Sequence, residues 1–175
     1  MKGYNLHVKS FRLKPVETKE FLNFLEEDLE NIRRVIKALE DRDVEFEVHS
    51  KSEPIEESVE SSPLDEERII KTLIFKNESG DLLAVLCPGD KRVDESKLEE
   101  ELCESIDMAE RSEIKEKTGY IVGGVSPFDL DIPVFASDEI PEGELRPSAG
   151  SRVVGVKIER NVIYEVLNPE VLDLT

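Results

Sequence analysis

The stretch Ile69–Cys87, with the sequence IIKTLIFKNESGDLLAVLC, decides the fold of this chain. It holds two apolar runs, 69–75 and 81–87, whose composition is typical of β-strands. The polar KNESG between them suits the connection of a hairpin. We therefore expect the two runs to pair as antiparallel strands.

The segments on both sides of this hairpin alternate between helical and strand-like patterns. Upstream, Phe21, Leu25, Leu29, Ile32, Ile36 and Leu39 recur at steps of three and four, which predicts an amphipathic helix over 18–41. The other expected elements are a strand at 44–48, helices at 93–103 and 112–117 with Gly119 as a C-cap, a strand at 131–136, a hairpin over 151–167 turning at Arg160-Asn161, and a last helical turn from Asn168.

These elements predict one α+β domain with a mixed, mainly antiparallel sheet that is curled and flanked by helices. A chain of 175 residues can bury a core without disulfides or metals. We expect residues 1–37 to form an N-terminal arm and most of the first helix, packed onto a domain of residues 38–175. The acidic, proline-broken segment 51–67 predicts a loop with short helical turns.

Composition bears on the possible partners. A net charge of -18 disfavours nucleic-acid binding through a broad basic surface, although a local basic patch stays compatible with it. The sequence has no run of 18 apolar residues and no signal-peptide pattern, so we expect no membrane partner and a cytoplasmic location. Cys87 and Cys103 are isolated, and we expect both to be small buried hydrophobic residues.

Histidine and metal chemistry have little support in the sequence. The two histidines, His7 and His49, are far apart and lie in strand-like segments, which argues against a Ser-His-Asp triad. Together with the two cysteines they lack the close paired spacing of zinc sites. We expect no metal and no cofactor.

Lys71 interrupts an apolar strand face, because Ile69, Leu73 and Phe75 are its neighbours at steps of two. A buried ammonium group without a partner is costly. Such a lysine either extends its stem to solvent or lines a pocket in which its charge is used. The pattern alone leaves both interpretations open.

Two small-residue segments are candidate binding loops. Gly123 and Gly124, followed by Ser126 and Pro127, allow positive φ and close approach to backbone N–H groups, as a binding loop or a plain turn would require. Ser148, Gly150 and Ser151 lie between Arg146 and Arg152, where they could hold a ribose or phosphate or simply cap a strand-entry turn.

In this order, the segments resemble the YbaK/prolyl-tRNA editing domain family of aminoacyl-tRNA deacylases. The resemblance covers about residues 38–175, and its most specific part is Thr-Gly-Tyr-x-x-Gly-Gly-x-Ser-Pro, some fifty residues after Lys71. The matching segments are VEFEVH (44–49), IIKTLIF (69–75), MAERSEIKEKTGYIVGGVSPF (108–128), PVFASDEI (133–140) and SAGSRVVGVKI (148–158).

The resemblance implies that the chain hydrolyses the ester bond of mischarged aminoacyl-tRNA, with cysteine, alanine or serine as the amino acid. The chain is similar to the free-standing, trans-editing members of the family. The resemblance places Lys71 at the position of the family's essential lysine and Gly123-Gly124 in its glycine-rich substrate loop. We expect Lys71 and the N–H groups of Gly123 and Gly124 to be the catalytic groups. The expected substrate-binding residues are Ser126, Pro127, Ser148, Gly150 and Ser151. This sequence departs from many members at Asp129, where they have glycine, and at Lys51, where they have tyrosine.

The partners implied are the acceptor end of aminoacyl-tRNA and, as a second candidate, an aminoacyl-tRNA synthetase. The candidate cations for tRNA are Lys91, Arg92, Arg111, Lys115, Arg146 and Arg152, each of which could equally be a solvated surface charge. Two alternatives stay open, a catalytically weak module that binds tRNA or an aminoacyl ester, and a protein–protein adaptor. The sequence does not indicate the oligomeric state.

Overall fold

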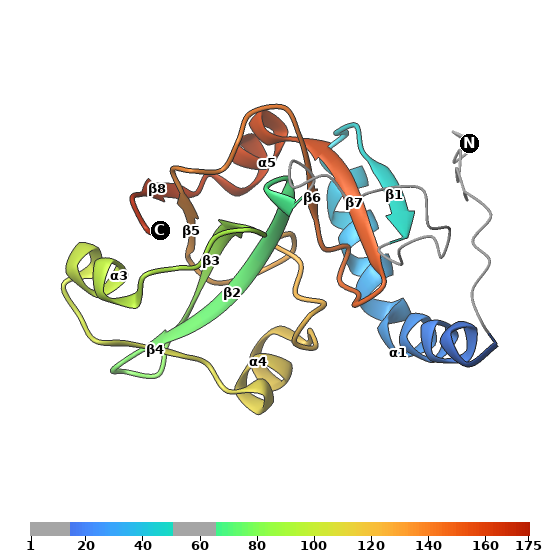
Figure 1. The fold of residues 1–175 in the computed structure, drawn as a ribbon, viewed down its shortest axis with the longest axis horizontal. Coiled ribbons are helices and arrows are strands. Elements are labelled where there is room, and N and C mark those ends of the chain that lie inside the picture. The colour runs from blue at the N-terminus through green and yellow to red at the C-terminus, as the bar shows by residue number, and fades with distance from the viewer. Residues whose placement is uncertain (1–14, 51–65) are drawn as a thin grey trace.

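A computed structural model describes residues 15–50 and 66–175 of the chain. Its strands form one sheet in the order β1-β7-β6-β2-β3-β5-β8, with β4 paired to β2, and helices lie around it (Figure 1). The strands are β1 (Glu47–Ser50), β2 (Ile69–Asn77), β3 (Leu82–Pro88), β4 (Ile106–Met108), β5 (Val134–Ser137), β6 (Glu144–Pro147), β7 (Val154–Glu159) and β8 (Glu170–Leu172). The helices are α1 (Pro15–Glu40), α3 (Glu95–Leu102), α4 (Arg111–Thr118) and α5 (Arg160–Leu167).

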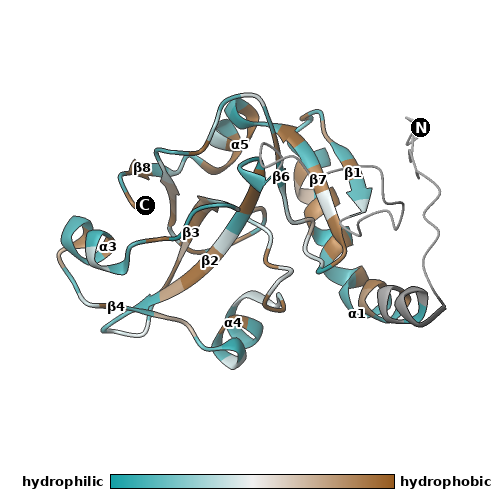
Figure 2. Ribbon diagram, in the orientation of Figure 1, coloured by the Kyte–Doolittle hydropathy of each residue, from teal (hydrophilic) through white to brown (hydrophobic). Residues whose placement is uncertain are grey.

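The β2–β3 hairpin predicted from the sequence is confirmed. Its strands are antiparallel, and Lys71 lies opposite Cys87 in the register. Every residue of β3 is buried, which explains why its sequence is continuously apolar instead of alternating. In Figure 2, brown covers much of β2, whereas α3 and α4 are largely teal.

The α+β class and the mixed sheet are confirmed, whereas the expectation of a mainly antiparallel sheet is wrong. Four strand pairings are antiparallel and three are parallel, the parallel ones being β2–β6, β3–β5 and β5–β8. Parallel partners must be joined by long crossovers. The local hairpin signals used for the prediction report only on neighbours in sequence.

The predicted hairpin over 151–167 is also wrong, because only its first half is a strand. After β7 the chain continues as helix α5, with Ile163 buried against the core. A short run such as VIYEVL fits a strand and a helix turn equally well, and packing decides between them. The last helical turn predicted from Asn168 is absent: Asn168 is a left-handed C-cap with φ 46, and β8 follows it.

Helix α1 agrees with the predicted span and with most of the predicted apolar face, except at Leu29. Its buried apolar residues are Ile32, Val35 and Leu39, whereas Leu29 is 41% exposed. Asp28 takes the core-facing position that had been assigned to Leu29. The acidic segment 51–65, with Lys51, and the first 14 residues lie outside the described residues, so the expected N-terminal arm stays a prediction.

The sheet separates two apolar clusters. Ile70 and Ile74 of β2 join α1, α4 and α5 in the larger cluster. Phe75 points to the opposite face and packs with Leu98 of α3 in the smaller one. Cys87 is buried as predicted, but Cys103 is exposed because it forms the left-handed C-cap of α3. Within the described ranges, none of the helices combines the length and the apolar character that a bilayer crossing requires.

Candidate functional site

Lys71 lies where β2 emerges from the core. On its face of the strand Ile69 is exposed and Phe75 is buried, and Lys71 itself is half-buried. Its ammonium group donates a hydrogen bond to the backbone carbonyl of Lys91, in the turn after β3. With the described residues it forms no ion pair. An ammonium group that no carboxylate neutralises can offer its charge to a developing oxyanion.

The strands beside β2 determine which side chains surround Lys71. In the parallel β2–β6 pairing Ile69 and Ile70 lie opposite Arg146 and Pro147, so Ser148 follows at the level of Lys71. On the other side, the antiparallel register places Cys87 opposite Lys71. Burial raises the pKa of the Cys87 thiol, which keeps it protonated and a poor nucleophile.

The glycine loop, residues 119–129, connects the end of α4 to the segment before β5. Gly119 ends α4 with φ 77, as predicted, and Gly123 is exposed with φ 89. The N–H of Gly124 donates to the carbonyl of Ile121 at 2.8 Å, closing a turn. Gly123 thus presents the accessible backbone of the pair, while Gly124 serves the turn.

Ser126 and Pro127 are buried inside the glycine loop. The Ser126 hydroxyl accepts a hydrogen bond from the Phe128 N–H at 3.2 Å and is also bonded to Tyr120. The Tyr120 hydroxyl donates to the Phe128 carbonyl at 2.9 Å, and burial raises the pKa of Tyr120 to about 12. In this structure these groups hold the loop in shape.

The serine loop, residues 148–152, connects β6 to β7, and hydrogen bonds from Ser148 and Ser151 shape it. The Ser148 hydroxyl donates to the Ser151 carbonyl at 3.0 Å and accepts from the Gly150 and Ser151 N–H groups at 3.2 and 3.3 Å. The Ser151 hydroxyl accepts from the Val153 N–H at 3.1 Å. Both serines are buried, so the predicted serines act here as turn-forming residues.

The three predicted segments form a continuous chain of neighbours. Lys71 lies level with Ser148, and the serine loop contacts the glycine loop so closely that a Cβ at Gly124 would lie 2.9 Å from the Ser151 carbonyl carbon. Val125, the residue after the glycine pair, packs in the larger cluster, on the sheet face opposite to that of Lys71. Among the described contacts, the serine loop is therefore what connects Lys71 to the glycine pair.

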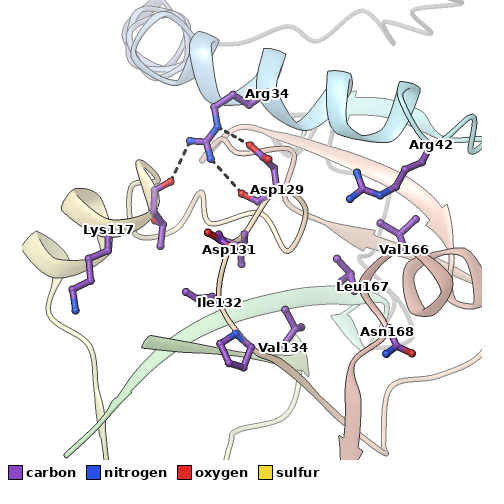
Figure 3. Close-up of a pocket in the computed structure, with 13 residues that line it drawn as sticks. Arg34, Arg42, Lys117, Asp129, Asp131, Ile132, Val134, Val166, Leu167 and Asn168 are labelled. Carbon is purple, nitrogen blue, oxygen red and sulfur yellow. Dashed lines mark hydrogen bonds and ion pairs between the residues drawn. The ribbon is translucent and has the colours of Figure 1, made fainter. Parts of the chain in front are cut away.

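An open cleft of about 670 Å³ is lined by Arg34 of α1, by the segment 129–134 and by the end of α5 (Figure 3). Its apolar wall includes Ile132 and Val134 and the end of α5, and Arg34 and Asp129 form an ion pair on its rim. The lining residues are Arg34, Arg42, Lys117, Thr118, Asp129, Leu130, Asp131, Ile132, Pro133, Val134, Val166, Leu167 and Asn168. Lys71 is not among them.

A known family model covers the segments that form this site. The model of the aminoacyl-tRNA editing domain matches residues 49–152, which is more than half of the chain and includes Lys71 and both loops. The chain belongs to the aminoacyl-tRNA editing domain family. The resemblance seen in the sequence is thereby confirmed.

Relatives of the editing domain include short proteins and much longer synthetases. A protein of Enterococcus faecalis named "Putative Cys-tRNA(Pro)/Cys-tRNA(Cys) deacylase EbsC" is 28% identical over 125 residues, 69% of this chain and 76% of the relative. The proline–tRNA ligase of Caldicellulosiruptor bescii is 36% identical over 87 residues, 49% of this chain and only 15% of the ligase. A solved structure described as "a putative trans-editing enzyme for prolyl tRNA synthetase" has a TM-score of 0.70 at 23% identity, covering 83% of this chain and 96% of that chain, and so shows the same fold.

The six cations predicted to contact tRNA differ in whether they already form ion pairs or hydrogen bonds within this editing domain. Arg152 is held by Asp28 and Glu27, and Lys91 by Glu139 at 3.0 Å. Lys115 donates to the Gly119 carbonyl, and Arg146 lies 3.9 Å from Glu144. Arg92 and Arg111 are exposed and form no ion pair with the described residues, which makes them the best placed of the six.

Sequence reasoning missed a polar row on α1 that contacts both loops of the editing domain. Asp28, Asn31 and Arg34 are spaced by three, and Asp28 and Asn31 are only 1% and 6% exposed. A signal was available, because Leu25, Asp28, Ile32, Val35 and Leu39 also follow the helical step, with one carboxylate among apolar residues. Among the described residues, no group of His, Cys, Asp and Glu side chains could hold a metal ion.

Proposed function

We propose that this editing domain hydrolyses the ester that joins a small amino acid to the terminal ribose of tRNA, with Lys71 as the catalytic residue. The observation that carries the proposal is a half-buried lysine on a core strand whose ammonium group binds only a backbone carbonyl among the described residues. The name of the Enterococcus faecalis relative supports aminoacyl-tRNA as the substrate class. We further propose that this chain acts in trans on tRNA, as a cytoplasmic protein.

In the proposed reaction, water attacks the ester carbonyl and forms a tetrahedral oxyanion. The bond to the ribose oxygen then breaks, and that oxygen takes up a proton as the free amino acid leaves. Lys71 stabilises the oxyanion, and the exposed backbone of Gly123 is the second candidate donor. Cys87 is buried with a raised thiol pKa, so no side-chain nucleophile is assigned.

A panel of mischarged tRNAs tests the proposal. The pure protein is incubated with tRNA carrying cysteine, alanine or serine and with correctly charged prolyl-tRNA, and release of the amino acid is followed. We expect turnover of at least one small amino acid and protection of proline, because a pocket shaped for small side chains excludes a larger one by bulk. Binding of intact aminoacyl-tRNA without turnover would contradict the proposal and favour the weakly catalytic binding module.

Replacing Arg92 by alanine is expected to weaken tRNA binding several-fold at low salt. Arg92 follows Lys91, whose carbonyl binds the Lys71 ammonium group, so the acceptor end would meet this cation as it enters the site. Each lost phosphate contact reduces the slope of log affinity against log salt by about 0.7 to 0.9. The measurement is a salt titration of the dissociation constant.

The matched control for Arg92→Ala is Lys37→Ala, which removes the same charge from an exposed lysine paired with Asp41 on α1. If both variants change the salt dependence equally, Arg92 acts only through the net charge and makes no direct contact with tRNA.

A further inference from the structure

The polar row on α1 connects the helix to both loops of the candidate site. The Asn31 side-chain amide donates to the Gly119 carbonyl at 3.1 Å, at the start of the glycine loop. Asp28 accepts the backbone N–H of Arg152 at 2.9 Å and two bonds from its guanidinium group, at the end of the serine loop. A buried carboxylate and amide are tolerated because these bonds satisfy them.

The helix backbone also approaches the serine loop closely. Gly150 has φ 83, and a Cβ there would lie 2.9 Å from the Asn31 carbonyl oxygen. At the end of the same loop, the guanidinium carbon of Arg152 lies 4.1 Å from the centre of the Phe24 ring on α1. The serine loop is therefore fixed against α1 by backbone packing and by charge.

Arg34 holds the glycine loop at both of its ends (Figure 3). At the first end its guanidinium group donates to the Thr118 carbonyl at 3.1 Å and lies 4.7 Å over the ring of Tyr120. At the far end it donates to the Asp129 carboxylate at 2.9 Å and to the Asp129 carbonyl at 3.3 Å. One planar group thus spans the two ends, which a lysine could not do with the same geometry.

Asp129 has the left-handed backbone conformation, with φ 58. Such a conformation is tolerated by aspartate at some cost, and the two bonds from Arg34 hold it in place. The Arg34 and Asp129 side chains are 32% and 47% exposed. An ion pair this accessible contributes little to global stability, so its main effect is local.

We propose that Arg34 is a positioning residue of this editing domain, which fixes the glycine loop against α1, on which the serine loop also packs, by binding Thr118 and Asp129 together. The inference rests on the proposed deacylase function for its kinetic consequence. In this proposal Arg34 acts through the loop that it holds and not on the substrate itself. Its loss lets the loop that carries Gly123 shift relative to Lys71, and displacements of about 1 Å can cost about 10²-fold in rate.

The experiment compares Arg34→Ala and Arg34→Lys with the control Arg160→Ala. Arg160 is matched in environment: its side chain is 28% exposed, lies 5.0 Å over the ring of Tyr164, and binds the Ile140 carbonyl and the Glu142 carboxylate. It contacts neither loop through these bonds. Deacylation kinetics on mischarged tRNA and hydrogen exchange of the backbone amides of residues 119–129 are measured for each variant.

We expect Arg34→Ala to lower kcat about 10- to 10²-fold with little change in KM, and to speed hydrogen exchange in the glycine loop. Arg34→Lys should recover part of both, and Arg160→Ala should change neither. Asp129→Gly removes the carboxylate without straining the backbone. In the double variant with Arg34→Ala, we expect the loss of kcat to be smaller than the sum of the two single losses in free energy.

The proposal is overturned if Arg34→Ala loses no more kcat than Arg160→Ala, or if exchange in residues 119–129 is unchanged. Absence of turnover in the unmodified protein would instead refute the proposed function. Hydrogen exchange would then still decide whether Arg34 fixes the loop.

Discussion

Replacing Lys71 by alanine is expected to lower the rate of deacylation about 10²- to 10³-fold, the usual cost of losing one good donor to an oxyanion. Lys71→Met should lose as much, because methionine keeps the apolar stem but lacks the charge. The Lys71 side chain makes only one hydrogen bond among the described residues, to the Lys91 carbonyl, so both variants should fold and melt close to the unmodified protein. Single-turnover hydrolysis of mischarged tRNA and thermal unfolding measure the two effects.

Lys76→Ala is the control for removing a lysine from the same strand. The Lys76 ammonium group binds both Glu113 carboxylate oxygens, at 3.1 and 3.0 Å, and this hydrogen bonding raises the pKa of Lys76. Its charge is already paired, so we expect its loss to change the rate only a few-fold. A Lys71→Ala variant that deacylates as fast as Lys76→Ala would remove Lys71 from the mechanism.

The features of the fold that depend on local sequence were predictable. The β2–β3 hairpin and helix α1 each follow from a pattern within one continuous segment. The pairing of β2 with β6 was not predictable, because Ile69 and its partner Arg146 are far apart in the chain and no local signal connects them. Helix α5 was missed because a run of eight residues can fit either type of element.

The candidate site was predictable to the extent that single residues break a pattern. Lys71 interrupts an apolar strand face, and this alone marked it for attention. Asp28 breaks the helical stripe in the same way, but Leu29 beside it offered an equally regular spacing and concealed it. Asp129 was noticed only by resemblance. Its ion pair with Arg34 forms through tertiary packing, for which the sequence carries no local signal.

Replacing Gly124 by alanine is expected to separate the two loops and lower the deacylation rate about 10²-fold. A methyl group there would lie 2.9 Å from the Ser151 carbonyl carbon and 3.0 Å from the Arg152 nitrogen, both backbone atoms that cannot rotate away. Overpacking of this kind costs about 1–3 kcal/mol of stability. We expect part of that cost to be relieved by a shift of the glycine loop, which would displace Gly123 from the ester in the proposed reaction.

Gly80→Ala separates this steric effect from simple backbone strain. Gly80 has φ 81 in the β2–β3 turn, and a Cβ there would meet no atom within 4 Å, so alanine should cost about 1–2 kcal/mol through conformation alone. Its rate per folded molecule should not change. If Gly124→Ala lowers the melting temperature but hydrolyses mischarged tRNA as fast as Gly80→Ala, the spacing of the two loops does not control the reaction, and Lys71 must act without the glycine loop.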